Sequence, residues 1–165
     1  AEVRVFMPNL DLIKEKDSRD RLLSLMADCH LLQMNESEAS LLLDKPFSAD
    51  DIGQLADFGA EISIVTLGSK GAVMMEKGKE AVRQEGFPVE TVATTGAGDV
   101  FCASMVYYHW LRGKRPPLEV CLRMANWIAA QKVAHLGPWS GIPSRQERKA
   151  KLLEWWPDYT MKKDD

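Results

Sequence analysis

Residues 94–99, with the sequence Thr-Thr-Gly-Ala-Gly-Asp, combine an anion-binding type of turn with a carboxylate. Gly96 and Gly98 let the backbone bend sharply and approach a ligand closely. The apolar run 100–111 follows directly and predicts a buried helix. Because the N-terminus of a helix presents N–H groups and the positive end of the helix dipole, this turn suits a phosphate group.

Asp99 stands at the start of that helix, where it would be repelled by a bound phosphate. The simplest chemical reason for its presence is that it takes a proton from the group that attacks the phosphate. An aspartate in the first turn of a helix also compensates the helix dipole, which is a purely structural role. The spacing alone leaves both interpretations open.

Residues 94–101 closely resemble the second signature of the ribokinase-like (PfkB) carbohydrate kinases, Asp-Thr-x-Gly-Ala-Gly-Asp-x-Phe. The resemblance implies that Asp99 is the catalytic base on the acceptor hydroxyl. It also implies that the backbone N–H groups of Gly96, Ala97 and Gly98 hold the charge that builds on the transferred phosphate.

The chain departs from this signature at Ala93, where the family usually has Asp. In relatives activated by a monovalent cation, that Asp helps to bind K⁺ together with carbonyls near the central turn and the closing loop. Gly141 stands where some relatives have Ser. A strong monovalent-cation site is therefore not expected here.

Asn35-Glu-Ser-Glu38 follows residues 29–34, a mostly apolar run that suits a buried parallel strand. Asn35 can cap a helix while Glu38 reaches back to it, which is a capping box. Asn-x-x-Glu also resembles the family motif that holds the Mg²⁺–phosphate assembly, usually through water, so Asn35 is a nucleotide contact and Glu38 the metal residue by resemblance. One carboxylate is chemically adequate because Mg²⁺ keeps several waters. The two interpretations are compatible.

Residues 67–71 form a predicted tight turn between strands at 62–66 and 72–75, which alone is only a hairpin. The turn is not a Walker loop, because it lacks the Gly-Lys-Ser/Thr spacing and no helix follows. It resembles the family's Val-Thr-x-Gly-x-x-Gly turn, which lies along the nucleotide. The resemblance implies ATP contacts at Thr66, Gly68 and Gly71.

The apolar segment 118–136 predicts a buried helix that resembles the family helix bordering adenine and ribose. Asn126 on this helix needs a polar partner if it is buried, and that partner is either the nucleotide or the backbone. Gly137 and Pro143 match the family's closing loop in their spacing, and residues 144–147 predict a further capping box.

The composition is that of a soluble globular chain of 165 residues, with 45% hydrophobic and 27% charged residues. A net charge of −3 argues against a role on nucleic acid or on a membrane surface. The three cysteines show no CxxC pairing, which favours reduced core thiols and a cytoplasmic location. No run has the length of a transmembrane helix and no signal peptide is visible. The first residue is Ala, which suggests a fragment or a processed product.

The resemblance runs from residue 9 to residue 143 and matches only the C-terminal, nucleotide-binding half of such a kinase. We therefore expect one α/β domain over residues 1–165, a doubly wound three-layer Rossmann-like sheet with mostly parallel strands and helices on both faces. It should be incomplete, without the N-terminal half and the lid. The ligand should lie at the carboxyl ends of the strands.

The function implied is ATP-dependent phosphoryl transfer to a hydroxyl of a sugar or sugar-like substrate, of the fructokinase or ribokinase type, with ATP and Mg²⁺ as cofactors. Family dimers usually form through the lid, so the full-length protein could form a homodimer. The alternative is a non-catalytic, kinase-derived module that binds a nucleotide or a partner. Ala93 and the absent half favour this alternative, as do Met7 and Asp11, which depart from the family's Asp-x-Asn-x-Arg strand end.

Overall fold

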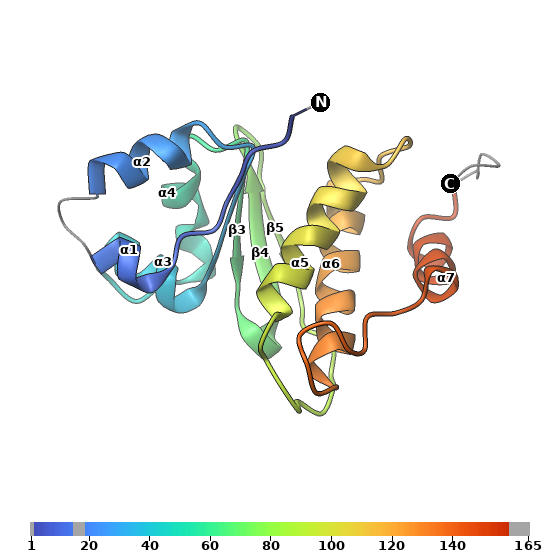
Figure 1. Cartoon of the computed structure of the whole chain (residues 1–165). Coiled ribbons are helices and arrows are strands. Elements are labelled where there is room, and N and C mark those ends of the chain that lie inside the picture. The colour runs from blue at the N-terminus through green and yellow to red at the C-terminus, as the bar shows by residue number, and fades with distance from the viewer. Residues whose placement is uncertain (1, 15–18, 159–165) are drawn as a thin grey trace. The chain divides into compact units, whose positions relative to one another are not determined.

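The computed structural model describes residues 2–14 and 19–158 (Figure 1). The chain divides into two compact units, Ala1–Glu85 and Gly86–Asp165, and each is described by itself. The predicted single domain over residues 1–165 stays a prediction.

The first unit is built on a five-stranded sheet with the order β1-β2-β3-β4-β5. β1 pairs with β2 and β2 with β3 in parallel, whereas β3–β4 and β4–β5 are antiparallel. The sheet is therefore mixed rather than mostly parallel, because two tight turns follow β3. The strands are β1 (Val5–Phe6), β2 (Leu31–Asn35), β3 (Ile62–Thr66), β4 (Ala72–Glu76) and β5 (Ala81–Gln84).

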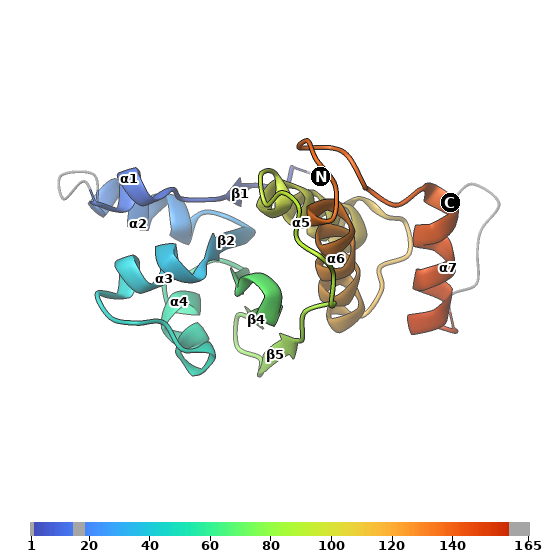
Figure 2. The same cartoon turned by 90° about the horizontal axis from the view of Figure 1, so that it is seen from below.

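The helices of the first unit lie together on one side of its sheet (Figures 1 and 2). The core between them contains Met26 from α2, Leu42 from α3 and Leu55 from α4, each at most 1% exposed. Leu32 and Met34 of β2 and Val65 of β3 face the same cluster. The helical elements are α1 (Leu10–Lys14), α2 (Arg19–Ala27), α3 (Glu36–Leu43), the 3-10 turn η2 (Ala49–Asp51), α4 (Ile52–Ala56) and the 3-10 turn η3 (Gly68–Lys70).

The second unit consists of α5 (Ala97–Val106), the π-helical turn η4 (Tyr107–Leu111), α6 (Leu118–Val133) and α7 (Arg145–Trp155). The helix predicted at residues 100–111 starts three residues earlier and ends in the π-helical turn. α5 and α6 run side by side (Figures 1 and 2). α7 contacts α6 through the edge-to-face pair Trp127 and Trp155, whose ring centroids are 6.0 Å apart.

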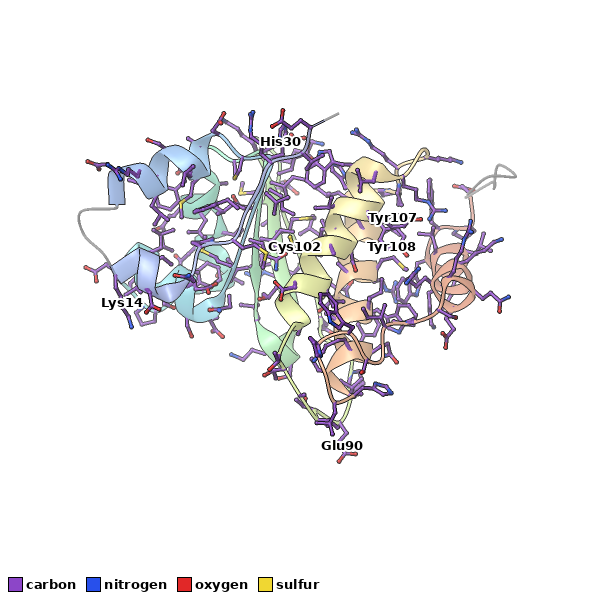
Figure 3. The ribbon with its side chains drawn as sticks, in the orientation of Figure 1. Lys14, His30, Glu90, Cys102, Tyr107 and Tyr108 are labelled. Atoms are coloured by element: carbon purple, nitrogen blue, oxygen red, sulfur yellow. The ribbon has the colours of Figure 1, made fainter. Side chains whose placement is uncertain are left out.

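The three cysteines are unpaired and buried, as their apolar surroundings predicted. Burial raises the pKa of Cys29 and Cys102 to about 11 and that of Cys121 to about 12, so these thiols stay protonated at neutral pH. Figure 3 shows Cys102 on α5. No helix within the described ranges has the length and apolar character needed to cross a bilayer.

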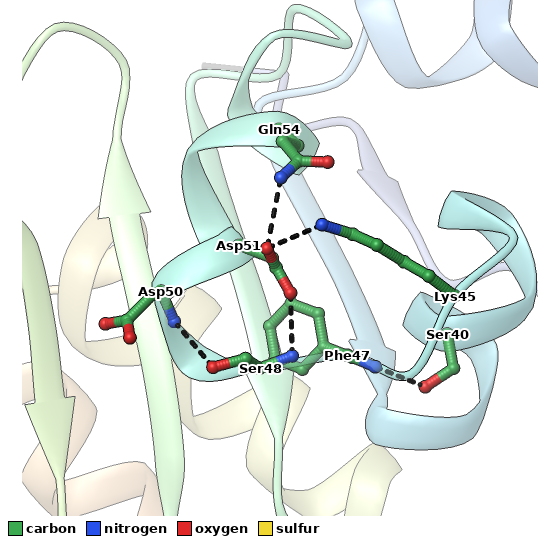
Figure 4. Close-up of polar contacts among 7 residues, drawn as sticks. All are labelled: Ser40, Lys45, Phe47, Ser48, Asp50, Asp51 and Gln54. Carbon is green, nitrogen blue, oxygen red and sulfur yellow. Dashed lines mark hydrogen bonds and ion pairs between the residues drawn. The ribbon is translucent and has the colours of Figure 1, made fainter.

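The turn before α4 is held by a network around Asp51 (Figure 4). The carboxylate of Asp51 accepts hydrogen bonds from Ser48 N (2.8 Å), Lys45 Nζ (2.7 Å) and Gln54 Nε2 (3.0 Å). Ser48 Oγ accepts from Asp50 N at 3.4 Å, which completes a capping box at this helix start. The network fixes the connection between α3 and α4.

We predict that the pKa of Asp51 lies below its ordinary value of 3.8, first because of the hydrogen bond from Lys45. NMR titration of the side-chain carboxyl should show this, and Lys45→Met should raise the pKa of Asp51. Gln54→Ala is the matched control and should have a smaller effect, since Gln54 contributes least. Because the pKa is lower in the folded chain, the ionised carboxylate stabilises the fold above the unfolded-state pKa, and this contribution is lost as the pH falls through the folded-state pKa. If the pKa of Asp51 is the same in Lys45→Met as in the wild type, the network around Asp51 is contradicted.

Candidate functional site

The carboxyl ends of β2 and β3 bring two of the predicted residues together. Asn35 is the last residue of β2, Thr66 is the last residue of β3, and the two are partners in the parallel register. Asn35 is exposed and Thr66 is partly exposed. Both residues therefore lie at one edge of the sheet, the edge where α/β folds place their ligands.

The predicted capping box at Asn35 is confirmed. Glu38 N donates to Asn35 Oδ1 at 2.9 Å, and Asn35 N donates to Glu38 Oε2 at 2.8 Å. This pair of bonds holds the Glu38 carboxylate, which is partly buried, at the same edge of the sheet. Since hard cations such as Mg²⁺ prefer oxygen ligands, the fixed carboxylate suits the predicted metal role, which stays a prediction.

The turn after β3 leaves its backbone open at Gly68. A Cβ atom built on Gly68 meets nothing within 4 Å, and the residue has a φ of +59°. Gly71 closes the turn with a φ of +103°, and its O accepts a hydrogen bond from Leu67 N at 2.8 Å. The open space at Gly68 fits a turn that a ligand approaches closely.

Lys70 in the same turn was not singled out by the sequence patterns. Its Nζ lies 3.8 Å from Glu36 Oε1 in the first turn of α3, and both side chains are largely exposed. An exposed ion pair of this length contributes little to stability. It does place the ammonium group of Lys70 at the edge of the sheet where β2 and β3 end.

The glycine turn of the second unit precedes α5 as predicted, but one of its three predicted anion donors, the Ala97 N–H, already bonds within the turn. Gly96 is the N-cap of α5 in the left-handed conformation, with φ of 81°. Ala97 N donates to Thr94 O (3.1 Å), and Val100 N donates to Gly96 O (3.0 Å), so the helical ladder starts directly at the turn. The first turn of α5 contains Gly98 and Asp99, which are both exposed.

The turn is held in place by the closing loop. A Cβ atom on Gly96 would lie 2.9 Å from Pro138 O and 3.3 Å from Pro138 Cα. Only glycine therefore satisfies both the positive φ and the close approach of the loop backbone. The resemblance had indicated the closing loop by the spacing of Gly137 and Pro143, and the structure packs that loop directly on the turn.

Asp99 lines a cavity of about 450 Å³ together with Arg145 and Arg148 of α7. Arg148 Nη1 donates to Pro143 O at 2.9 Å. Tyr108 lines the same cavity, and burial raises its pKa to about 12 against the opposing effect of Arg148. Figure 3 shows Tyr107 and Tyr108 on the segment that continues α5. No sequence pattern indicates a role for either arginine, although the two stand three residues apart in the first turns of α7.

The remaining nucleotide candidate, Asn126, lies on α6 and is 8% exposed. Asn126 has an interaction partner within the protein. A contact between Asn126 and the nucleotide stays a prediction. Among the described residues there is no group of three or more His, Cys, Asp and Glu side chains that could hold a metal ion.

The predicted site residues thus form two groups, one in each unit. The first unit holds Asn35, Glu38, Thr66, Gly68 and Gly71, and the second holds Gly96, Ala97, Gly98, Asp99 and Asn126. The residues of the first unit lie at the carboxyl ends of β2 and β3 and in the turns that follow, those from Gly96 to Asp99 lie at the start of α5, and Asn126 lies on a helix, as predicted.

Comparison with known proteins identifies a family for this arrangement. The family model described as "pfkB family carbohydrate kinase" matches residues 1–145. A ribokinase of Haemophilus influenzae is 32% identical over 133 residues, which cover 78% of this chain and 41% of that protein. An ATP-dependent 6-phosphofructokinase of Thermoanaerobacterium thermosaccharolyticum is 29% identical over 127 residues, 77% of this chain and 38% of that protein. The chain therefore spans about two fifths of the length of these curated relatives.

A solved structure supports the fold. The ribokinase of Arabidopsis thaliana complexed with ribose and ATP is similar to this chain with a TM-score of 0.68 and 29% identity, over 79% of this chain and 43% of that one. The expected α/β, ribokinase-like fold class is thus confirmed.

Gly68 and Gly96 both have a positive φ but differ in how closely other atoms surround them, which yields a prediction about stability. Gly68→Ala should cost about 1 kcal/mol, because an L-residue in the left-handed region is strained but meets no neighbour. Gly96→Ala should cost clearly more, since its Cβ also collides with the Pro138 backbone. Urea unfolding followed by circular dichroism measures both free energies of unfolding. Equal costs would show that the closing loop does not press on the turn.

Proposed function

Because the chain belongs to the pfkB family of carbohydrate kinases, we propose that it carries the nucleotide site and the catalytic base of an ATP-dependent kinase. The acceptor is a hydroxyl of a sugar or sugar-like molecule. The observation that carries the proposal is the glycine turn at the start of α5, with Gly96 as its left-handed cap and Asp99 exposed in the first helical turn. The relatives named above act on sugars and a sugar phosphate, which defines the substrate class to test.

Asp99 is the base in this proposal. Its exposed carboxylate takes the proton of the acceptor hydroxyl as the oxygen forms a bond to the γ-phosphorus and the bond to ADP breaks. The backbone of Gly96, Ala97 and Gly98 lies at the positive end of the α5 dipole, where it favours the charge on the transferred phosphate. Positioning and electrostatics of this kind make up most of phosphoryl-transfer catalysis.

The edge of the sheet in the first unit fits the nucleotide. The Gly68 backbone is open to a ligand, and Thr66 and Gly71 flank it in the same turn. Glu38 would hold Mg²⁺ through water and Asn35 would contact the nucleotide, since the capping box keeps their oxygen atoms at this edge. When bound, Mg²⁺ neutralises charge on the phosphates. The cytoplasmic location and the homodimer stay predictions.

The base assignment predicts that Asp99→Asn reduces turnover by roughly 10²–10⁴-fold, the usual contribution of a positioned base. Binding of ATP with Mg²⁺ should survive, because the amide keeps the shape of the side chain. Turnover is measured with ribose, deoxyribose, fructose and fructose 6-phosphate, and binding by calorimetry. Replacement of Gly98 by Trp is the control that should abolish binding itself. Equal loss of turnover and binding in Asp99→Asn would remove Asp99 from the role of base.

The discriminator from the alternative, a non-catalytic nucleotide-binding module, is turnover in a protein that includes the N-terminal half expected from the resemblance. Such a protein that binds ATP but phosphorylates no acceptor would favour the alternative. Wild-type protein that binds no ATP would refute the nucleotide site in this chain.

The metal assignment is tested by Glu38→Gln. Glutamine at this position can still bond to Asn35 N, so the helix cap and the fold should be preserved. The charge is lost, and the gain in ATP affinity that Mg²⁺ gives the wild type should therefore shrink. Calorimetry with and without Mg²⁺ measures the gain, and Glu36→Gln on the same helix is the matched control. An unchanged Mg²⁺ effect in Glu38→Gln would assign the metal elsewhere.

A further inference from the structure

Lys132 is a fully buried charged residue that the proposed mechanism does not use. It lies in the last turn of α6, its side chain is 0% exposed, and its Nζ donates to Ala93 O at 2.8 Å. It forms no ion pair with any described residue. Burial of an ammonium group is costly unless the site accepts it specifically, so its presence indicates a local need for positive charge.

The place suits a cation because the Ala93 carbonyl oxygen meets the C-terminal end of α6 there. α6 ends at this point, and the C-terminal end of a helix favours positive charge. Val92 N and Ala93 N both donate to Val133 O, at 2.8 and 3.0 Å. The segment 92–93 is therefore clamped to the end of α6 by two backbone bonds and by the Lys132 side chain.

This clamp is one residue away from the glycine turn. Ala93 precedes Thr94, whose O accepts the hydrogen bond from Ala97 N that opens α5. On the other side, the closing loop packs on Gly96 through Pro138. The contacts that orient the Ala93 carbonyl therefore also help to fix the conformation of the glycine turn.

A monovalent cation does not fit the residues around this clamp. Ala93 offers no carboxylate, and its carbonyl oxygen already accepts the Lys132 hydrogen bond. Gly141 offers no hydroxyl, and a Cβ atom there would collide with His135 Nδ1 and lie 2.7 Å from Gln131 O. The loop backbone thus sits directly on the last turn of α6 and leaves no room for a side-chain ligand.

We propose that Lys132 is a built-in cation: it supplies from the protein the fixed positive charge and the carbonyl contact that a bound monovalent cation would otherwise bring to the glycine turn. The inference rests on the proposed function, since the turn must hold a phosphate for the charge to matter. Lys132 is a positioning residue, because it touches the backbone of the turn and not the nucleotide. Nucleotide binding is then independent of K⁺.

The first test uses the wild-type chain. Its affinity for ATP with Mg²⁺ is measured by calorimetry in choline chloride, NaCl and KCl at equal ionic strength. The three dissociation constants should agree within about twofold, well below the roughly tenfold effect expected from adding a nearby charge. A tenfold gain in KCl would overturn the proposal without any variant having to fold.

The second test removes the charge with Lys132→Met, which nearly preserves the side-chain length. Affinity in choline chloride should fall about tenfold, and K⁺ or NH₄⁺ should restore part of it by occupying the position that Nζ leaves. Lys132→Arg should keep most of the affinity. Lys149→Met on α7 is the matched control and should bind like the wild type in every salt. A loss that no small cation restores would mean that Lys132 only supports packing.

A third readout separates this proposal from the proposed function. The unfolding temperature of Lys132→Met should rise with K⁺ or NH₄⁺ relative to choline, whereas that of the wild type should not. This measurement needs no nucleotide. Absence of ATP binding by the wild type would refute the proposed function alone. An unfolding temperature of Lys132→Met that does not change with K⁺ or NH₄⁺ would refute the built-in cation.

Discussion

The backbone contact between Gly96 and the closing loop is the constraint on which the second unit depends. The hypothetical Cβ of Gly96 lies 2.9 Å from Pro138 O, so loop and turn cannot move independently. The same loop reaches the end of α6 at Gly141, and α6 holds the segment that leads into the turn. The turn, the loop and the helix end therefore form one closed set of contacts. A turn that binds phosphate, as proposed for residues 94–99, would gain from this, because groups that are already in place need no reorganisation when charge develops.

Charge in the second unit is distributed around this turn in a way that composition does not reveal. The chain has a net charge of −3, yet Arg145 and Arg148 line the cavity beside Asp99 and Lys132 is buried behind the turn. An ammonium group in the interior acts more strongly than one in water, since less solvent screens it. The local field at the turn is thus set by a few placed cations rather than by the overall balance.

Local patterns predicted most of the fold and the turns of the site. The capping boxes at Asn35 and Ser144 and the tight turn at residues 67–71 depend on neighbours in sequence, and all three are confirmed. The antiparallel half of the sheet follows from the same tight turns, although the overall expectation was a mostly parallel one. The short helix α1 (Leu10–Lys14) and the π-helical end of α5 carry no comparable local signal. The role of Lys132 could not be predicted, because its partner Ala93 is 39 residues away.

Glu38 shows why a structural and a chemical interpretation of one motif need not compete. Its carboxylate accepts the Asn35 N–H, and this bond both caps α3 and fixes the position of the oxygen atoms at the edge of the sheet. A metal ligand that is already held in place loses less freedom when the metal binds, which is the advantage of a preorganised site. The cap also forms without any ligand, so the folding of α3 does not depend on the metal. Gly96 likewise serves two purposes. Its positive φ shapes the start of α5, and its lack of a side chain leaves room for the closing loop.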